Sequence, residues 1–393
     1  RPSLRSPALS TDTSTGVIVY CILRFFTEYL IYCSIMKYII FALVLILVVW
    51  YFFFRKKHKF WDHQPVSRGV MKYEGIISET IPSPLTVKSP NEIVTVNPTD
   101  ASLQKMLPGF LNKHFVNEYT YDNKYVSWIL DFPGLNSNNM TTIQQHNNVI
   151  GTILSKPHTI NLNGNLIHSH YVDKLSVHEK HRNKNYAPVL ISNMLKNSCD
   201  DKYKTCIFKK EDNPLPFNNI CKTSYCVYDI TKPLKTNESY SLIPSTDKDF
   251  DYMKQLYQNE SVKYKCYPVF DTKQMKYIFT SRPGVYDSML IKVDDVPKGF
   301  LTYSINSIRG TKMKRAEITL LIGEDINLTE VIKLMVNRCH SRGITEVMCV
   351  NIAKNDGFIS DMKFTSEMPV YFQMYNYNLL NSLQPSDILY NFI

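Results

Sequence analysis

The chain has 393 residues, of which 12% are aromatic and 20% charged, and its formal net charge is +10. This composition excludes a largely disordered chain and leaves room for two domains with their own cores. Nine cysteines without a C-x-x-C pair argue against a disulfide framework or a zinc site, and they predict reduced, mostly packed thiols in a body that faces the cytosol.

One long apolar run lies near the N-terminus. Residues 38–54 carry no charge, and together with Met36 they are long enough to cross a bilayer, so we expect a transmembrane helix over 36–54. Its aromatic end suits the membrane interface, and a small-residue cleavage site is absent, which argues against a signal peptide. The positive-inside rule predicts a single-pass protein with a cytosolic body, because basic residues follow the run: Arg55, Lys56, Lys57 and Lys59.

The preceding residues, 1–35, are treated as an uncertain N-terminal extension. The chain begins with Arg1, and Met36 is an alternative start. A second apolar stretch over 16–35 contains both Arg24 and Glu28, so we do not expect it to span a membrane.

A weak internal repeat organises the remaining chain. A strand-like segment, a proline and an amphipathic run occur around Pro98 and again around Pro244, 146 positions later. Strands that carry Gly151 and Gly299 follow, 148 positions apart, and each is followed by a further strand and helix. A near-constant offset predicts two copies of one α/β unit with a mixed sheet, although chance matches of short signals stay possible. The expected divisions are a basic juxtamembrane segment and linker over 55–90, a first lobe over 91–235 and a second lobe over 236–393.

The densest signal for a functional site lies between Leu175 and Ile191. An apolar strand ends near Val177, a basic loop with Arg182 and Lys184 follows, and a helix begins near Pro188. Proline in the first helical turn sacrifices no hydrogen bond, and the free N–H groups of that turn attract anions. The pattern fits a pyrophosphate site, with a solvated basic loop as the alternative.

The same segment resembles a family signature, and two further segments support the resemblance. Val177-His178, Arg182, Lys184 and Ala187-Pro188-Val189-Leu190-Ile191 are similar to the long signature of N-myristoyltransferases, which transfer a myristoyl group to the N-terminal glycine of proteins. Residues 59–66 (KFWDHQPV) and the closing block from Asn355 to Tyr377 resemble the family in the same order. The resemblance implies two tandem acetyltransferase-like (GNAT) lobes behind the transmembrane helix.

It also implies the ligands and the site. Myristoyl-CoA would be the co-substrate, without a permanent cofactor or metal, and Gly-initiated proteins would be the partners of a monomer that binds no nucleic acid. The backbone N–H groups of Lys174 and Leu175 would form the oxyanion hole, and the terminal carboxylate of Ile393 would act as general base. The acyl-CoA would be held by Lys59, Phe60, Trp61, Val177, Arg182, Asn183, Lys184, Asn185, Ala187 and Pro188. The peptide groove would include Phe115, Val116, Tyr119, Tyr121 and Asn351.

The sequence departs from the family at several of these places. Asp173-Lys174-Leu175 stands where the family has Asn-Phe-Leu, and Asn185 replaces a basic residue. Groove motifs around 208–211 and 224–226 are altered, which predicts a changed peptide preference. Two other functions therefore stay open: a GNAT transferase for a different acyl chain, and a catalytically degenerate protein that binds acyl-CoA or a partner.

Overall fold

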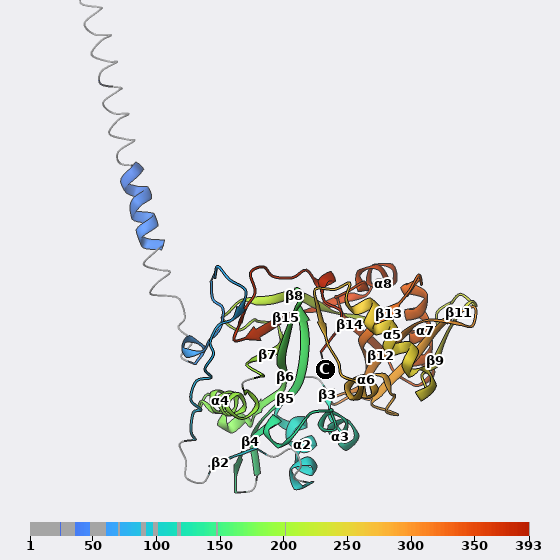
Figure 1. Cartoon of the computed structure of the whole chain (residues 1–393), viewed down its shortest axis with the longest axis horizontal. Helices are drawn as coiled ribbons and strands as arrows, with labels where there is room; N and C mark the ends of the chain where they lie inside the picture. The colour runs from blue at the N-terminus through green and yellow to red at the C-terminus, as the bar shows by residue number, and fades with distance from the viewer. Residues whose placement is uncertain are drawn as a thin grey trace, which may run out of the picture. The chain divides into compact units, whose positions relative to one another are not determined.

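A computed structural model of the chain describes residues 24, 36–47, 60–69, 71–87, 92–96, 101–115, 119–146, 148–200 and 202–392 (Figure 1). It forms two units, Arg1–Asp62 and His63–Ile393. In the first unit, residues 36–47 are helical and their apolar side chains are exposed. The rest of the predicted transmembrane helix, 48–54, lies outside the described residues. In the part of the chain that is described, none of the helices has the length and apolar character needed to cross a membrane.

The second unit consists of two halves that follow each other along the chain. After the short helix η1 (Trp61–His63) and strand β1 (Gly75–Ile76), the first half runs β2 (Glu92–Val96), α2 (Ala101–His114), β3 (Tyr119–Thr120), α3 (Asn123–Leu130), η2 (Ser137–Asn139), β4 (Met140–Gln145), β5 (Asn148–Leu162), β6 (Asn165–Val177), η3 (Glu179–His181), α4 (Tyr186–Ser198), β7 (Thr205–Glu211) and β8 (Asn219–Asp229). The strand ending at Val177 and the helix with Pro188 in its first turn are as predicted.

The second half repeats this order with one additional helix. It runs β9 (Tyr240–Pro244), η4 (Asp247–Asp249), α5 (Phe250–Ser261), β10 (Cys266–Pro268), α6 (Thr272–Phe279), β11 (Tyr286–Val293), β12 (Val296–Ile308), β13 (Lys314–Gly323), α7 (Leu328–Ser341), β14 (Glu346–Val350), α8 (Asn355–Met362), β15 (Thr365–Tyr375), β16 (Tyr377–Asn378) and η5 (Pro385–Asp387). The predicted repeat is therefore present, from the strand–helix start of each half to its final strand.

The two halves share one sheet. Its strand order is β2-β4-β5-β6-β7-β15-β8-β14-β13-β12-β11-β9, and β10 and β3 add to β5 and β12. Read from either end, equivalent strands of the two halves follow in the same order until the centre. There, β15 of the second half pairs with β7, and β8 of the first half pairs with β14. The short strands are exchanged as well, since β10 joins the first half and β3 the second. The predicted boundary at 235 thus falls between halves that are interleaved, and the domain division stays a prediction.

Helices α3 and α6, which occupy equivalent places in the two halves, meet in the shared core. Trp128 of α3 stacks on Tyr277 of α6 with ring centroids 5.7 Å apart, and the Tyr277 hydroxyl donates to the Trp128 carbonyl. Each helix begins with an aspartate cap, Asp122 or Asp271. A second core cluster lies under α7 and α8 in the second half.

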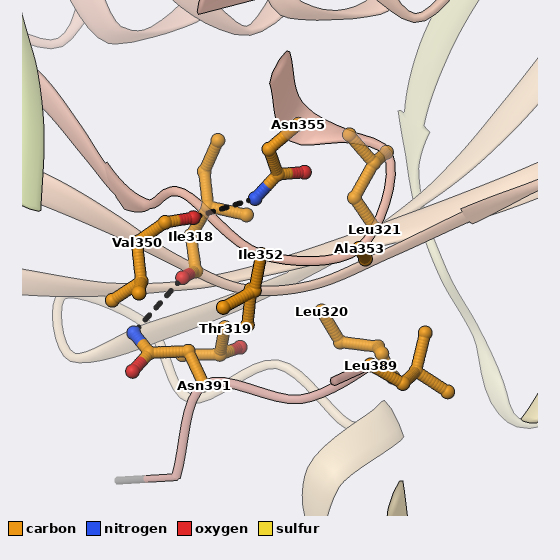
Figure 2. Close-up of a pocket in the computed structure, with 10 residues that line it drawn as sticks. All are labelled: Ile318, Thr319, Leu320, Leu321, Val350, Ile352, Ala353, Asn355, Leu389 and Asn391. Atoms are coloured by element: carbon orange, nitrogen blue, oxygen red, sulfur yellow. Dashed lines mark hydrogen bonds between the residues drawn. The ribbon is translucent and has the colours of Figure 1, made fainter. Parts of the chain in front are cut away.

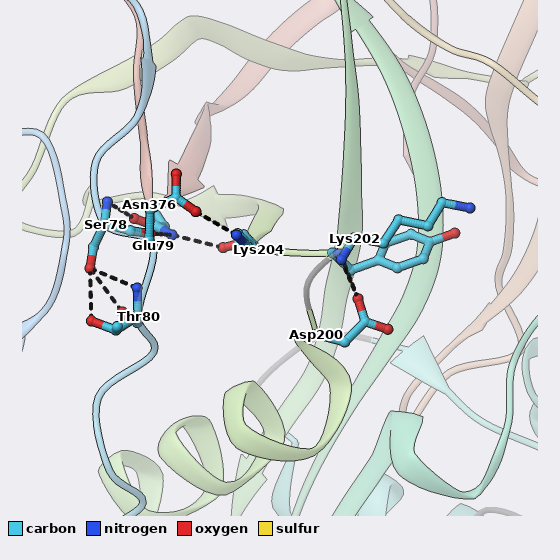
Figure 3. Close-up of polar contacts among 8 residues, drawn as sticks. Ser78, Glu79, Thr80, Asp200, Lys202, Lys204 and Asn376 are labelled. Carbon is cyan, nitrogen blue, oxygen red and sulfur yellow. Dashed lines mark hydrogen bonds and ion pairs between the residues drawn. The ribbon is translucent and has the colours of Figure 1, made fainter.

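Part of the predicted linker is fixed to the body. The Ser78 N–H donates to Asn376 Oδ1 at 2.8 Å, and Asn376 Nδ2 donates to the carbonyls of Ser78 and Lys204 (Figure 3). Glu79 pairs with Lys204, and β1 adds to β16. This segment therefore passes the start of β7 and the end of β15, which are neighbouring strands in the middle of the sheet.

Candidate active site

The predicted oxyanion residues form a bulge in β6. Strands β5 and β6 pair Thr152 with Ser176 and Leu154 with Asp173, so Lys174 and Leu175 together oppose one residue, Ile153. Lys174 has a φ of +55°, a left-handed conformation that is unusual outside glycine. A bulge takes backbone groups out of the regular ladder. It can thereby present N–H groups to a ligand, which is what an oxyanion hole requires.

The carboxylate of Asp173 binds both the backbone and the side chain of the next residue in this bulge. Its Oδ1 accepts from the Lys174 backbone N–H at 2.6 Å, and its Oδ2 accepts from the Lys174 ammonium at 2.6 Å. Burial acts to raise the pKa of Asp173, but the ammonium groups of Lys174 and Lys156 outweigh burial and hold this pKa at about 2. Burial likewise opposes the charge of Lys174, yet Asp173 and the nearby tyrosines raise its pKa well above the usual value. Both partners are therefore charged at neutral pH.

Aromatic rings surround the Lys174 ammonium. Its Nζ lies 5.1 Å from the ring centroid of Tyr121, 5.6 Å from that of Phe115 and 5.7 Å from that of Tyr125. The structure thus brings two predicted groove residues, Phe115 and Tyr121, to the predicted oxyanion bulge. Tyr125, on α3, was missed because a single tyrosine in a helix carries no signal of its own. Of the other predicted groove residues, Val116 lies outside the described residues.

The two remaining groove residues, Tyr119 and Asn351, lie further along the sheet. The Tyr119 hydroxyl contacts Met348 Sδ at 3.8 Å, and the Asn351 backbone pairs with residues of β8. Their predicted roles are untested by these contacts.

The described end of the chain is held against strands β6, β7 and β13. Asn391 Nδ2 donates to Glu317 Oε1 at 2.8 Å, and Lys209 Nζ donates to Asn391 Oδ1 at 2.7 Å. Phe392 is fully buried and stacks on Tyr171 of β6, with ring centroids 5.6 Å apart. Ile393 lies outside the described residues, so its predicted role as general base stays a prediction.

A buried lysine that the sequence analysis missed lies on the neighbouring strand. Lys156 of β5 pairs across the ladder with Tyr171, and its Nζ lies 5.5 Å from the Tyr171 ring centroid. Burial lowers the pKa of Lys156 to about 7, although Asp173 acts to raise it. Nothing in the local sequence distinguishes this lysine from a surface lysine.

A small pocket lies next to Asn391 and contains the start of α8 in its wall. Figure 2 shows Asn391 donating to the Ile318 carbonyl and Asn355 donating to the Val350 carbonyl. Most of the side chains that line this pocket are aliphatic, and Asn355 and Asn391 fasten its wall through their hydrogen bonds.

The predicted phosphate loop connects β6 to α4. Asn183 and Asn185 both adopt left-handed conformations, with φ of 63° and 65°, before the helix starts at Tyr186. Such turns direct successive backbone N–H groups to one side and favour anions. Lys184 is exposed, and Ala187 and Pro188 lie in the first helical turn, beside free backbone donors.

Arg182 connects the predicted phosphate loop to neighbouring elements, and its role as a phosphate ligand stays a prediction. Its Nε donates to the Val177 carbonyl at 3.2 Å and its Nη2 to the His114 carbonyl at 2.8 Å, so it ties the loop to β6 and α2. Of the remaining predicted CoA residues, Lys59 lies outside the described residues. Phe60 and Trp61 belong to the first unit, where their rings lie 4.9 Å apart, and their role stays a prediction.

Comparisons with known proteins support the same interpretation. Residues 71–217 match the family described as myristoyl-CoA:protein N-myristoyltransferase, N-terminal domain. The glycylpeptide N-tetradecanoyltransferase of Dictyostelium discoideum is 22% identical over 82% of this chain and 90% of that protein. The Kluyveromyces lactis protein of the same name is 23% identical over 61% of this chain and 62% of that protein. The crystal structure of Saccharomyces cerevisiae N-myristoyltransferase with bound myristoyl-CoA aligns with a TM-score of 0.78 and 16% identity, covering 86% of this chain and 100% of that one.

The chain is similar to the N-myristoyltransferases in the matched domain, in its curated relatives and in its fold. The resemblance found in the sequence is confirmed, and the α/β fold is that of the N-myristoyltransferases. The segment matched to the N-myristoyltransferase N-terminal domain contains the bulge, the loop and α4. The functional roles of the individual residues remain predictions.

Proposed function

We propose that this protein transfers a myristoyl group from myristoyl-CoA to the N-terminal glycine amine of protein substrates. The observation that carries the proposal is the β6 bulge with its adjoining loop. Within 15 residues, Lys174 to Pro188, it combines displaced backbone N–H groups with a basic turn that precedes a helix. An acyl-CoA needs both features, because its phosphates are anionic and its carbonyl becomes an oxyanion during transfer.

In the proposed reaction, the neutral amine of the acceptor attacks the thioester carbonyl. The N–H groups of Lys174 and Leu175 stabilise the oxyanion, the carbon–sulfur bond breaks, and CoA leaves as a thiolate. The acceptor's ammonium first gives one proton to the terminal carboxylate of Ile393, and the proton that its nitrogen releases after the attack passes to the CoA thiolate. The burial of Phe392 against Tyr171 of β6 supports this assignment, because it fixes the residue that precedes Ile393 in the chain. The loop from Val177 to Pro188 would bind the pyrophosphate and orient the thioester.

The test is acyl transfer by the whole 393-residue chain to three peptides that differ only at the N-terminus: free glycine, N-acetylated glycine and alanine. We expect mass spectrometry to show myristoylation of the free-glycine peptide alone. A variant that lacks Ile393 should lose this activity while still binding myristoyl-CoA. Equal transfer to the alanine peptide, or an unchanged rate without Ile393, would contradict the proposal.

The alternative, a catalytically degenerate acyl-CoA-binding protein, is favoured by one observation. The Lys174 N–H already donates to Asp173, so this donor reaches an oxyanion only when Asp173 releases it. Tight binding of myristoyl-CoA with no transfer to any glycine peptide would support the alternative.

We also propose that residues 36–54 anchor the protein to a membrane, with its body in the cytosol. Residues 36–47 support this proposal, because they are helical and expose large apolar side chains such as Phe41 and Leu47. Flotation of the whole chain with phosphatidylcholine vesicles tests the anchor. We expect co-flotation that resists alkaline carbonate and is lost when 36–54 are deleted; a whole chain that stays at the bottom of the gradient would contradict it.

A further inference from the structure

The side chain of Lys174 fills a site whose composition suits an ammonium group in general. Three rings, from Phe115, Tyr121 and Tyr125, lie between 5.1 and 5.7 Å from its Nζ. Asp173 supplies the anion at 2.6 Å. We call these four side chains the ammonium cage.

Such a cage can bind a cation strongly. Ring faces attract a cation within about 6 Å, and the attraction grows when water is excluded. The Lys174 side chain is only 10% exposed and that of Asp173 only 19%. A buried charge is costly unless its surroundings compensate for it. The cage therefore compensates the desolvation of an ammonium, whichever molecule supplies that ammonium.

The position of the cage connects it to the reaction. One Asp173 oxygen holds the Lys174 ammonium and the other holds the Lys174 backbone N–H. An ammonium in the cage is thus separated by a single carboxylate group from the N–H that is predicted to hold the oxyanion. This is the region in which the amine that attacks the carbonyl has to be placed.

The cage is partly open to solvent. Phe115 and Tyr125 are only partly buried, and Leu175, next to Lys174 in the bulge, is 36% exposed. The side chain of Lys174 can move out of the cage, because it is flexible and ends in a single compact ammonium. Two further charged groups interact electrostatically with this site. Lys156 of β5 interacts with Asp173 and Lys174, and Glu317 of β13 interacts with Tyr125.

We propose that the ammonium cage is the binding subsite for the acceptor's N-terminal ammonium, and that Lys174 occupies it as an internal substitute until an acceptor displaces it. This inference rests on the proposed function, since it names where that reaction's acceptor binds. Displacement of Lys174 also removes one of the two partners that hold Asp173 in place. Acceptor binding thereby loosens the contact between Asp173 and the Lys174 N–H and prepares the oxyanion hole.

The test measures peptide binding without acyl transfer. Isothermal titration compares a free-glycine peptide with the same peptide N-acetylated, in the presence of a myristoyl-CoA analogue whose thioester is replaced by an unreactive thioether. Lys174→Met keeps the length of the side chain and removes its charge. We expect this variant to bind the free-amine peptide at least tenfold more tightly than the unsubstituted protein does, with little change for the acetylated peptide.

Two further variants serve as controls. Asp173→Asn should abolish the preference for the free amine, and Lys204→Met, which removes a lysine paired with Glu79 away from the cage, should leave it unchanged. Thermal melting checks that each variant folds. If folded Lys174→Met gains no affinity for the free amine, or gains equally for both peptides, the inference is wrong. Absence of transfer together with an intact amine preference would contradict the proposed function while supporting the cage.

Discussion

The two halves of the body contain equivalent bulges with different linings. In the first half, the β5–β6 bulge is lined by two charged residues, Lys174, which is buried, and Asp173, which is partly buried. In the second half, the β12–β13 ladder shifts its register at Thr319. There the Thr319 hydroxyl bonds to neutral groups: the hydroxyls of Thr302 at 2.7 Å and Tyr286 at 3.0 Å, and the Thr302 carbonyl at 3.1 Å. The same kind of bulge therefore lies at a charged site in one half and in a neutral, hydrogen-bonded core in the other.

The loops that follow these bulges differ in the same way. The loop before α4 carries Arg182 and Lys184, whereas the loop before α7 carries Glu324 and Asp325. Both precede a helix N-terminus, which favours anions through its free N–H groups. Acidic side chains cancel that preference and basic ones strengthen it. The repeat thus preserved the fold in both halves, while only the first half suits a phosphate ligand.

The largest expected effect is a difference in kcat between backbone substitutions at the two bulges. Replacing the backbone amide of Leu175 by an ester removes one N–H and keeps the side chain. Loss of one oxyanion donor should lower kcat by about 10²–10³-fold. The same ester at Leu320, beside the second bulge, should leave kcat near the unsubstituted value once folding is matched. Equal losses at both positions would show that the first bulge has no special role.

Glycine substitutions compare the packing of the two halves. A Cβ at Gly151 would lie 2.9 Å from Leu190 Cδ1, the tip of a flexible side chain, whereas a Cβ at Gly299 would meet the backbone carbonyl of Ile322. We expect Gly151→Ala to cost about 1 kcal/mol of unfolding free energy, and Gly299→Ala about 3 kcal/mol or more. Urea denaturation measures both. A smaller loss at Gly299 would contradict this view of the close strand contact.

A pH effect arises from a buried histidine of the first half. His170 Nε2 lies 2.9 Å from the Ser198 carbonyl, and burial lowers the pKa of His170 to about 4, although the contact with Ser198 acts to raise it. The unfolded chain therefore binds the extra proton first, and folding stability falls as the pH drops from about 6.5 to 4. His170→Gln should remove about 2–3 kcal/mol of this acid sensitivity.

Urea denaturation at pH 7 and pH 4 measures the difference. The exposed His340 of α7 provides the matched variant, His340→Gln, which should keep the full acid sensitivity. If His170→Gln and the unsubstituted protein lose equal stability between the two pH values, burial of His170 does not have the predicted effect.

The smallest effect compares the two loops. Lys184 is exposed, so Lys184→Met should raise the Kd of myristoyl-CoA by only about 3–10-fold, and by less at high salt. Glu324→Gln in the second half should leave that Kd unchanged. Titration of myristoyl-CoA at two salt concentrations measures both. An equal effect of the two substitutions would remove the distinction between the loops.

Local patterns were sufficient for the elements around the site. The apolar strand to Val177, the basic turn and a proline in the first turn of α4 are short-range signals, and they predicted this segment correctly. The spacing of Gly151 and Gly299 revealed the repeat. These features depend on neighbouring residues, which a single sequence displays directly.

Long-range arrangements could not be predicted in this way. The exchange of β8 and β15 between the halves joins segments more than 130 residues apart, and no local pattern encodes it. The hydrogen bond from Arg182 to the His114 carbonyl, 68 residues away, has no local signal either. Lys156 and Lys174 resemble surface lysines in the sequence, and only the fold buries them. The resemblance marked Lys174 for its backbone, and the structure adds the part played by its side chain.

The most direct test of the central claim is a competition between acyl donors. The whole chain is incubated with a free-glycine peptide and equal concentrations of myristoyl-CoA and acetyl-CoA, and the products are separated by mass spectrometry. An N-myristoyltransferase should yield the myristoylated peptide almost exclusively. Predominant acetylation would instead identify a transferase of another acyl specificity and contradict the account.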